Sequence, residues 1–210
     1  MSEDYPSRFS PEYTRTSTPV AELRPRRKLR VGATAPQPGV AAPGRAERLP
    51  HRETSDTATI WWLGVHGGAG ETTLTTIAAG SKAAHHAWPV PAIPGAVNRV
   101  ALVARTHYAG LIAAQRAATE WAAGTINPTI YLTGLILIAD APGRRPKILR
   151  ELEQVISGGV PQVWTLPWVE AWRLGPVQTD TPLPKEFAQL CAELSVTSSS
   201  GAAHNRKATR

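Results

Sequence analysis

The chain has 210 residues, of which 42% are hydrophobic, so it is long enough for one domain with tails but hardly for two. Its formal net charge of +7 lies at the ends, because residues 1–55 carry a net +4 and residues 195–210 a net +3. Residues 56–194 are therefore neutral, which argues against a nucleic-acid interface on the domain itself. Nucleic-acid contact through the tails stays open beside the simpler interpretation that the tails are only solvated.

The single cysteine, Cys191, excludes an internal disulfide and gives no sign of an oxidising compartment. The most apolar run, residues 130–141, is about a dozen residues long, whereas a membrane-spanning helix needs about 20. The acidic first residues also lack the apolar stretch of a secretory signal. We therefore expect a cytoplasmic protein without a membrane span.

Residues 1–55 are rich in Pro, Ser, Thr and Arg and have no sustained apolar period. Such a segment buries too little apolar surface to offset the entropy lost on ordering, so we predict that it is disordered. Residues 195–210, with a Ser-Ser-Ser-Gly run and a basic end, lead to the same prediction. The folded domain is then expected to span residues 56–194.

Within this domain, short apolar runs alternate with segments of helical periodicity. In chain order we predict a strand over 60–65, a helix over 72–85, a strand over 99–104, a helix over 107–123, a strand over 132–139, a helix over 148–156, a strand over 161–166 and a helix over 187–194. This alternation predicts an α/β fold with a doubly wound, mostly parallel sheet and helices on both faces.

A glycine-rich loop joins the first predicted strand to the first predicted helix, with the sequence His-Gly-Gly-Ala-Gly-Glu-Thr-Thr over residues 66–73. Glycines in that position let consecutive backbone N–H groups converge on a phosphate, and the following helix adds its positive end. The hydroxyl of Thr72 stands where it would reach a Mg²⁺ ion.

The loop resembles the deviant phosphate loop of the ParA/MinD-like P-loop ATPase superfamily, Lys-Gly-Gly-x-Gly-Lys-Thr-Thr. All the fixed positions other than the two lysines match, whereas the first lysine is replaced by His66 and the second by Glu71. The resemblance implies a reduced P-loop NTPase-like fold, ATP or ADP with Mg²⁺ as cofactors, and dimerisation around the loop. It also suggests bacterial plasmid partition or conjugative transfer as settings. The residues that this assigns to nucleotide or phosphate binding are Gly67, Gly68, Ala69, Gly70, Glu71, Thr72, Thr73 and Asp140.

The charge at position 71 decides which activity to expect. A like-charge pair at 4 Å costs about 4 kcal/mol at an effective dielectric of 20, and the loss of the lysine removes stabilisation of the transition state. We therefore predict a pseudo-ATPase that acts as an adaptor or regulator with a protein partner, and a homodimer is open. The Glu71 carboxylate could itself occupy the anion site of an empty loop. The alternative is an ATP-binding protein that recruits a base from elsewhere, such as Lys82, Arg145 or a partner.

Three further groups of residues leave alternatives open. Asp140 is either a Walker B aspartate or lies after the strand beside the nucleotide base. Trp164, Trp168 and Trp172 either stack on a ligand or partner or lie partly in the core and partly at its rim. The basic turn over residues 144–147 either contacts phosphate or is solvated. The histidines give little support for a metal site, because no cysteine or carboxylate stands at ligand spacing.

Overall fold

The centre of the domain is a parallel β-sheet. The computed structural model describes residues 32–177 and 182–198, and five strands form the sheet in the order β4-β2-β6-β7-β8. These strands are β2 (Trp61–Gly64), β4 (Lys82–Ala83), β6 (Asn98–Arg105), β7 (Ile130–Ile138) and β8 (Val163–Leu166). The predicted α/β class with a mostly parallel sheet is confirmed.

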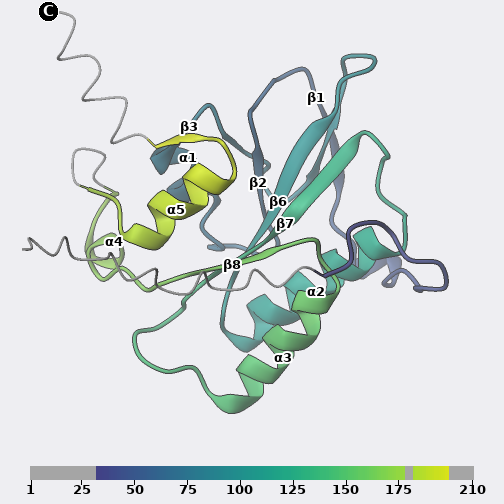
Figure 1. Ribbon diagram of the computed structural model, residues 1–210. Helices are drawn as coiled ribbons and strands as arrows, with labels where there is room; N and C mark the ends of the chain where they lie inside the picture. Colours follow the sequence, from purple (N-terminus) through teal and green to yellow (C-terminus); the bar gives the residue numbers. More distant parts are fainter. Residues whose placement is uncertain (1–31, 178–181, 199–210) are drawn as a thin grey trace, which may run out of the picture.

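Helices cover both faces of this sheet (Figure 1). One face carries α1 (Glu71–Ile77) and α5 (Lys185–Glu193), and the other carries α2 (Tyr108–Ala122) and α3 (Lys147–Gly158). A short helix, α4 (Ala171–Leu174), follows β8. The central stretches of the strands are apolar on both sides because successive side chains enter opposite cores. Trp61 packs in the core under α2 and α3, whereas Trp62 packs in the core under α1 and α5.

The strand order places a topological switch point at β2 and β6. If the five sheet strands are renumbered 1 to 5 in chain order, their order across the sheet is 2-1-3-4-5. This is the order of flavodoxin-like doubly wound sheets. The chain leaves β2 towards α1 on one face and leaves β6 towards α2 on the other. Ligands of such sheets bind in the crevice outside the carboxyl ends of the strands at this point. The glycine loop follows β2 and so lies at this position.

The first helix is shorter than predicted. The helix predicted over 72–85 ends at Ile77, and two short strands, β3 (Ala78–Ala79) and β4, follow it. Five of the seven helix residues are β-branched, a composition that lowers helix propensity. Gly80, at φ +79°, then turns the chain into the edge strand β4.

The N-terminal boundary at residue 55 is wrong for residues 32–54, which pack on the domain. A 3-10 helix, η1 (Arg45–Glu47), precedes β1 (His51–Thr54), and β1 pairs in parallel with β5 (Trp88–Pro91). The buried carboxylate of Glu120 holds this segment by accepting hydrogen bonds from the Leu49 backbone N–H and the Trp88 indole N–H, both at 3.1 Å. The prediction of disorder rested on composition, which does not show that β5 and Glu120, far along the chain, bind this segment.

The C-terminal boundary at residue 195 is also too early. Val196 is buried, and β9 (Thr197–Ser198) pairs with β3 in antiparallel orientation. The rest of the predicted tails, residues 1–31 and 199–210, lies outside the described residues.

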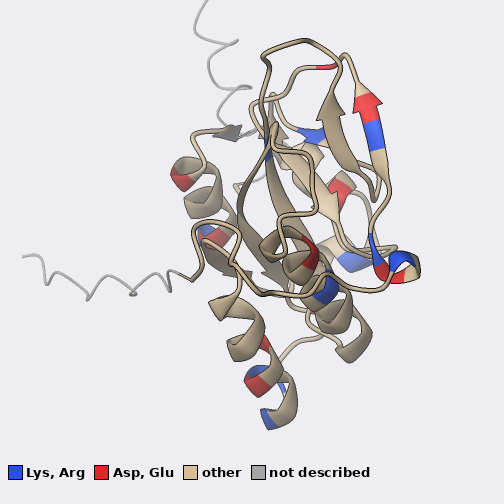
Figure 2. Cartoon of the chain, turned by 90° about the vertical axis from the view of Figure 1, so that its right-hand side faces the viewer, with Lys and Arg blue, Asp and Glu red and all other residues tan. Residues whose placement is uncertain are grey.

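Lys and Arg positions are interspersed with Asp and Glu positions along the described chain (Figure 2). Several of them form ion pairs, such as Lys82 with Asp56 at 2.7 Å and Arg116 with Glu47 at 2.8 Å. No helix in the described part of the chain is long and apolar enough to cross a lipid bilayer.

Candidate functional site

A cavity of about 330 Å³ opens at the switch point, where the carboxyl ends of the sheet strands meet. Loops after β2, β6, β7 and β8 form its walls together with α4 and α5. Its polar lining comes from the glycine loop and from charged or ionisable side chains around it. These residues are Gly67, Gly68 and Thr73, the arginines Arg105 and Arg173, the histidines His66 and His107, and Asp140. The cavity therefore combines the predicted loop with groups that the sequence did not place beside it.

The glycines of the loop differ in what requires them. Gly68 and Gly70 have left-handed backbones, at φ +73° and +116°, and a Cβ on Gly70 would lie 2.7 Å from Ile138. Gly67 has no positive φ, and a Cβ there would meet nothing within 4 Å. Neither backbone conformation nor packing in the described chain explains a glycine at position 67. The Gly67 backbone is open on the side of the cavity that it lines.

Several backbone N–H groups of the loop and of the start of α1 have no acceptor among the described residues. The first four N–H groups of an α-helix have no partner within the helix, and the first bond of α1 runs from the Leu74 N–H to the Gly70 carbonyl at 3.0 Å. Ala69, within the loop, is buried, and its N–H donates to the His66 carbonyl at 3.2 Å. The loop is therefore a compact turn that leaves N–H groups at the start of α1 for other acceptors.

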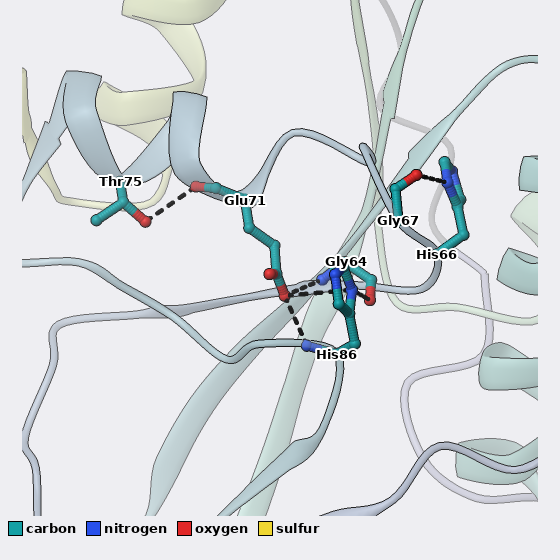
Figure 3. Close-up of polar contacts among 6 residues, drawn as sticks. All are labelled: Gly64, His66, Gly67, Glu71, Thr75 and His86. Atoms are coloured by element: carbon teal, nitrogen blue, oxygen red, sulfur yellow. Dashed lines mark hydrogen bonds and ion pairs between the residues drawn. The ribbon is translucent and has the colours of Figure 1, made fainter.

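Glu71, in the position of the phosphate-binding lysine, does not line the cavity. Its side chain is 8% exposed. Its Oε1 atom accepts hydrogen bonds from the Gly64 N–H at 2.6 Å and the His86 N–H at 3.2 Å. Figure 3 shows the side chain running towards Gly64 and His86, away from Gly67 and His66. The carboxylate thus binds backbone donors, as an anion would, but at the end of β2 rather than in the cavity.

The base that reaches the loop is Arg105, the last residue of β6. Its Nε donates to the Gly68 carbonyl at 3.4 Å and its Nη1 to the Ala139 carbonyl at 3.0 Å. Burial lowers the pKa of Arg105, nearby Asp140 raises it, and Arg173 lowers it. A guanidinium stays charged in proteins despite such a shift, so Arg105 brings a positive charge to the cavity.

The two bases that the sequence suggested for this role do not line the cavity. Lys82 pairs with Asp56 at 2.7 Å, and Arg145 pairs with Glu153 at 3.1 Å. The signal that could have identified Arg105 is its position, since it is the arginine that ends a buried strand beside the loop strand.

Asp140 and Thr73 line the cavity, whereas Thr72 does not. Asp140 follows β7, and its backbone N–H donates to the Thr106 hydroxyl at 3.1 Å. Thr72 is exposed and lines a different cavity, of about 460 Å³, beside β4. The geometry therefore gives no support to Thr72 as a ligand of Mg²⁺. Among the described residues, no group of three or more His, Cys, Asp or Glu side chains is placed to hold a metal ion.

The three tryptophans after β7 divide between core and rim. Trp164 is buried, and its indole N–H donates to Glu193 at 2.7 Å. Trp168 and Trp172 are partly exposed and line the cavity, and the Trp172 ring lies edge-on to Phe187 with centroids 4.6 Å apart. Together with four other apolar lining residues, Ile138, Pro167, Val169 and Phe187, they give the cavity an apolar wall beside its polar groups.

These features define a doubly wound α/β domain whose glycine loop shares a switch-point cavity with arginine side chains. The chain belongs to the family described as "Family of unknown function (DUF6668)", which matches residues 58–189. The matched range contains the five sheet strands, the glycine loop and the residues that line the cavity. Searches of curated proteins and of solved structures found no match.

Proposed function

We propose that the domain binds a phosphate-bearing small molecule, in the first place a nucleotide, in the switch-point cavity, and that it acts through binding rather than ATP hydrolysis. The observation that carries the proposal is the Arg105 guanidinium on the wall that also holds the open backbone of Gly67. A positive group beside a loop with unused N–H donors is the combination that phosphate recognition requires.

The residues present fit such a ligand. The cavity volume of about 330 Å³ lies at the lower end of the range for small-molecule sites. Arg105 and Arg173 would contact phosphate oxygens, since guanidinium groups match their geometry. Trp168 and Trp172 offer faces on which a flat ring would stack.

Two features argue against ordinary ATP hydrolysis. Phosphoryl transfer depends on charge stabilisation around the transferred group, and the lysine that would provide it is replaced by Glu71. The Glu71 carboxylate is also engaged by the Gly64 and His86 N–H groups, so it is not placed to act on a ligand in the cavity. Binding and hydrolysis are thus separable in this site.

A domain that binds a nucleotide without consuming it is suited to regulation or to adaptor work. As the setting of that work, we propose a bacterial complex that partitions or transfers DNA, with a protein partner; the support for this setting is the resemblance of the loop to ParA/MinD-like ATPases. In ParA/MinD-like loops the first lysine reaches across the dimer interface, and in this chain that position holds His66. The proposal therefore does not include a dimer with the nucleotide between its subunits.

Calorimetric titration of the full chain with ATP and ADP, with and without Mg²⁺, tests the proposal. We expect measurable binding without ATP turnover. Gly67→Ala should weaken ADP binding by about tenfold, because the new methyl group stands where the ligand approaches and the lost contacts are worth about 1.4 kcal/mol. Its thermal stability should stay close to that of the wild type.

Gly158→Ala is the matched control, since a Cβ there also meets nothing within 4 Å and the residue lies at the end of α3, away from the cavity. This variant should bind ADP like the wild type. Absence of ATP and ADP binding by the folded wild type, or an equal effect of the two glycine substitutions, would overturn the proposal.

A further inference from the structure

His66 uses both nitrogens of its ring within the chain. Its Nδ1 lies 2.8 Å from the Gly67 carbonyl oxygen, and its Nε2 lies 3.0 Å from the Arg105 backbone nitrogen. A carbonyl only accepts and a backbone N–H only donates, so Nδ1 must carry the hydrogen and Nε2 must be the bare acceptor. This arrangement requires the neutral ring in a single tautomer.

The ring is fitted between the two sides of the switch point. It lies edge-on to His107, the N-cap residue of α2, with ring centroids 5.0 Å apart. A Cβ on Gly110 would lie 2.9 Å from His66 Nε2, so the glycine makes room for the ring. His66 thereby ties the glycine loop after β2 to the end of β6, where the Arg105 guanidinium begins its reach into the cavity.

We propose that His66 is a positioning residue that works as a proton-controlled clasp, by which we mean its two hydrogen bonds, to the Gly67 carbonyl and from the Arg105 N–H. The neutral ring holds the glycine loop and Arg105 in the anion-binding arrangement. The protonated ring releases the Arg105 backbone. Protonation would point an Nε2–H group at the Arg105 N–H, so two donors would face each other. The effect on ligand affinity rests on the proposed function, whereas the clasp itself does not.

The surroundings of the ring favour the neutral form. Burial lowers the pKa of His66, the hydrogen bond to Gly67 raises it, and His107, His86 and Arg105 lower it further. The other charged groups nearby are Asp140 and Arg173, which line the same cavity, and Glu71, whose Oε1 lies 4.0 Å from the His86 ring.

The sign of the pH dependence follows from this lowered pKa. Between the folded pKa and the ordinary value of 6.5, the unfolded chain binds more protons than the folded one. The clasp is therefore closed above pH 6.5 and is lost as the pH falls through the lowered pKa of His66.

Nuclear magnetic resonance on the full chain tests the clasp without any ligand. We expect ring correlations of the Nδ1–H tautomer, and an Arg105 amide signal that titrates with the same midpoint as the His66 ring, below 6.5. In His66→Gln, whose Oε1 can accept from the Arg105 N–H but does not ionise, that titration should vanish. An Nε2–H tautomer, or an Arg105 amide that titrates unchanged in His66→Gln, would overturn the inference.

ADP titration at several pH values tests the effect on binding. We expect wild-type affinity, relative to His66→Gln, to fall by about tenfold from about pH 8 to about pH 5, because the loss of the partly buried hydrogen bond to the Arg105 N–H costs about that much. The ratio of the two proteins cancels the titration of the ADP phosphates. His66→Lys, charged throughout and unable to accept, should bind ADP weakly at every pH.

Simple attraction between a charged ring and an anion predicts the opposite sign, a relative affinity that rises as the pH falls, and that result would refute the clasp. The failure of the proposed function looks different. If ADP does not bind at any pH while the Arg105 amide still titrates with His66, the clasp stands and the assignment of a nucleotide ligand fails.

Discussion

Two cavities border α1, and they differ in how their charges are balanced. In the cavity of about 460 Å³ beside β4, Lys82 is paired with Asp56 at 2.7 Å. In the smaller switch-point cavity, two arginines face a single aspartate among the described lining residues. Uncompensated positive charge, rather than volume, therefore distinguishes the candidate anion site, because a base already paired with an acid gains little from a ligand.

The same contrast separates the two sides of the glycine loop. Glu71 places negative charge beneath the loop, where two backbone N–H groups hold it, and Arg105 places positive charge in the cavity.

Glu71→Lys should destabilise the fold strongly. The Gly64 and His86 N–H groups would lose their acceptor, and an ammonium would enter a site built for a carboxylate. We expect a loss of about 3–5 kcal/mol in the free energy of unfolding, measured by urea denaturation. Glu71→Gln keeps one acceptor oxygen and should cost about 1–2 kcal/mol. Recovery of ATP hydrolysis in a stable Glu71→Lys protein would contradict this placement of Glu71.

Arg105→Gln should weaken ADP binding by about 2 kcal/mol, or about thirtyfold, because it removes a charge-assisted contact. Lys82→Gln is the matched control, since Lys82 lines the other cavity and is already paired. Calorimetry should find its ADP affinity unchanged. A stronger effect from Lys82→Gln than from Arg105→Gln would reverse the assignment of the two cavities.

The two threonines at the start of α1 provide the smallest contrast. Thr73 lines the switch-point cavity and Thr72 lines the other one. We expect Thr73→Val to weaken ADP binding by about 1 kcal/mol, the typical worth of one hydrogen bond, and Thr72→Val to leave it unchanged. A loss of Mg²⁺-dependent binding confined to Thr72→Val would instead restore the magnesium role that the loop sequence suggests.

Local patterns in the sequence were enough to predict the alternation of strands and helices, the parallel sheet and the glycine loop. Runs such as residues 100–104 are apolar because both faces of the sheet are covered, and that requirement is visible in the residues themselves. The helix over 72–85 was predicted too long, since helical spacing continues where β3 and β4 actually pair with distant segments.

The class of fold and the place of the loop can therefore be read from local sequence, because apolar periodicity and glycine content act over a few neighbouring residues. Which groups face the loop becomes visible only in the folded chain. Arg105 donates a hydrogen bond to Gly68, which lies 37 residues away in the sequence. Glu120 accepts one from Leu49 of the N-terminal segment, 71 residues away. Such contacts depend on which strands lie side by side in the sheet, and the local sequence pattern of one strand does not specify its neighbours.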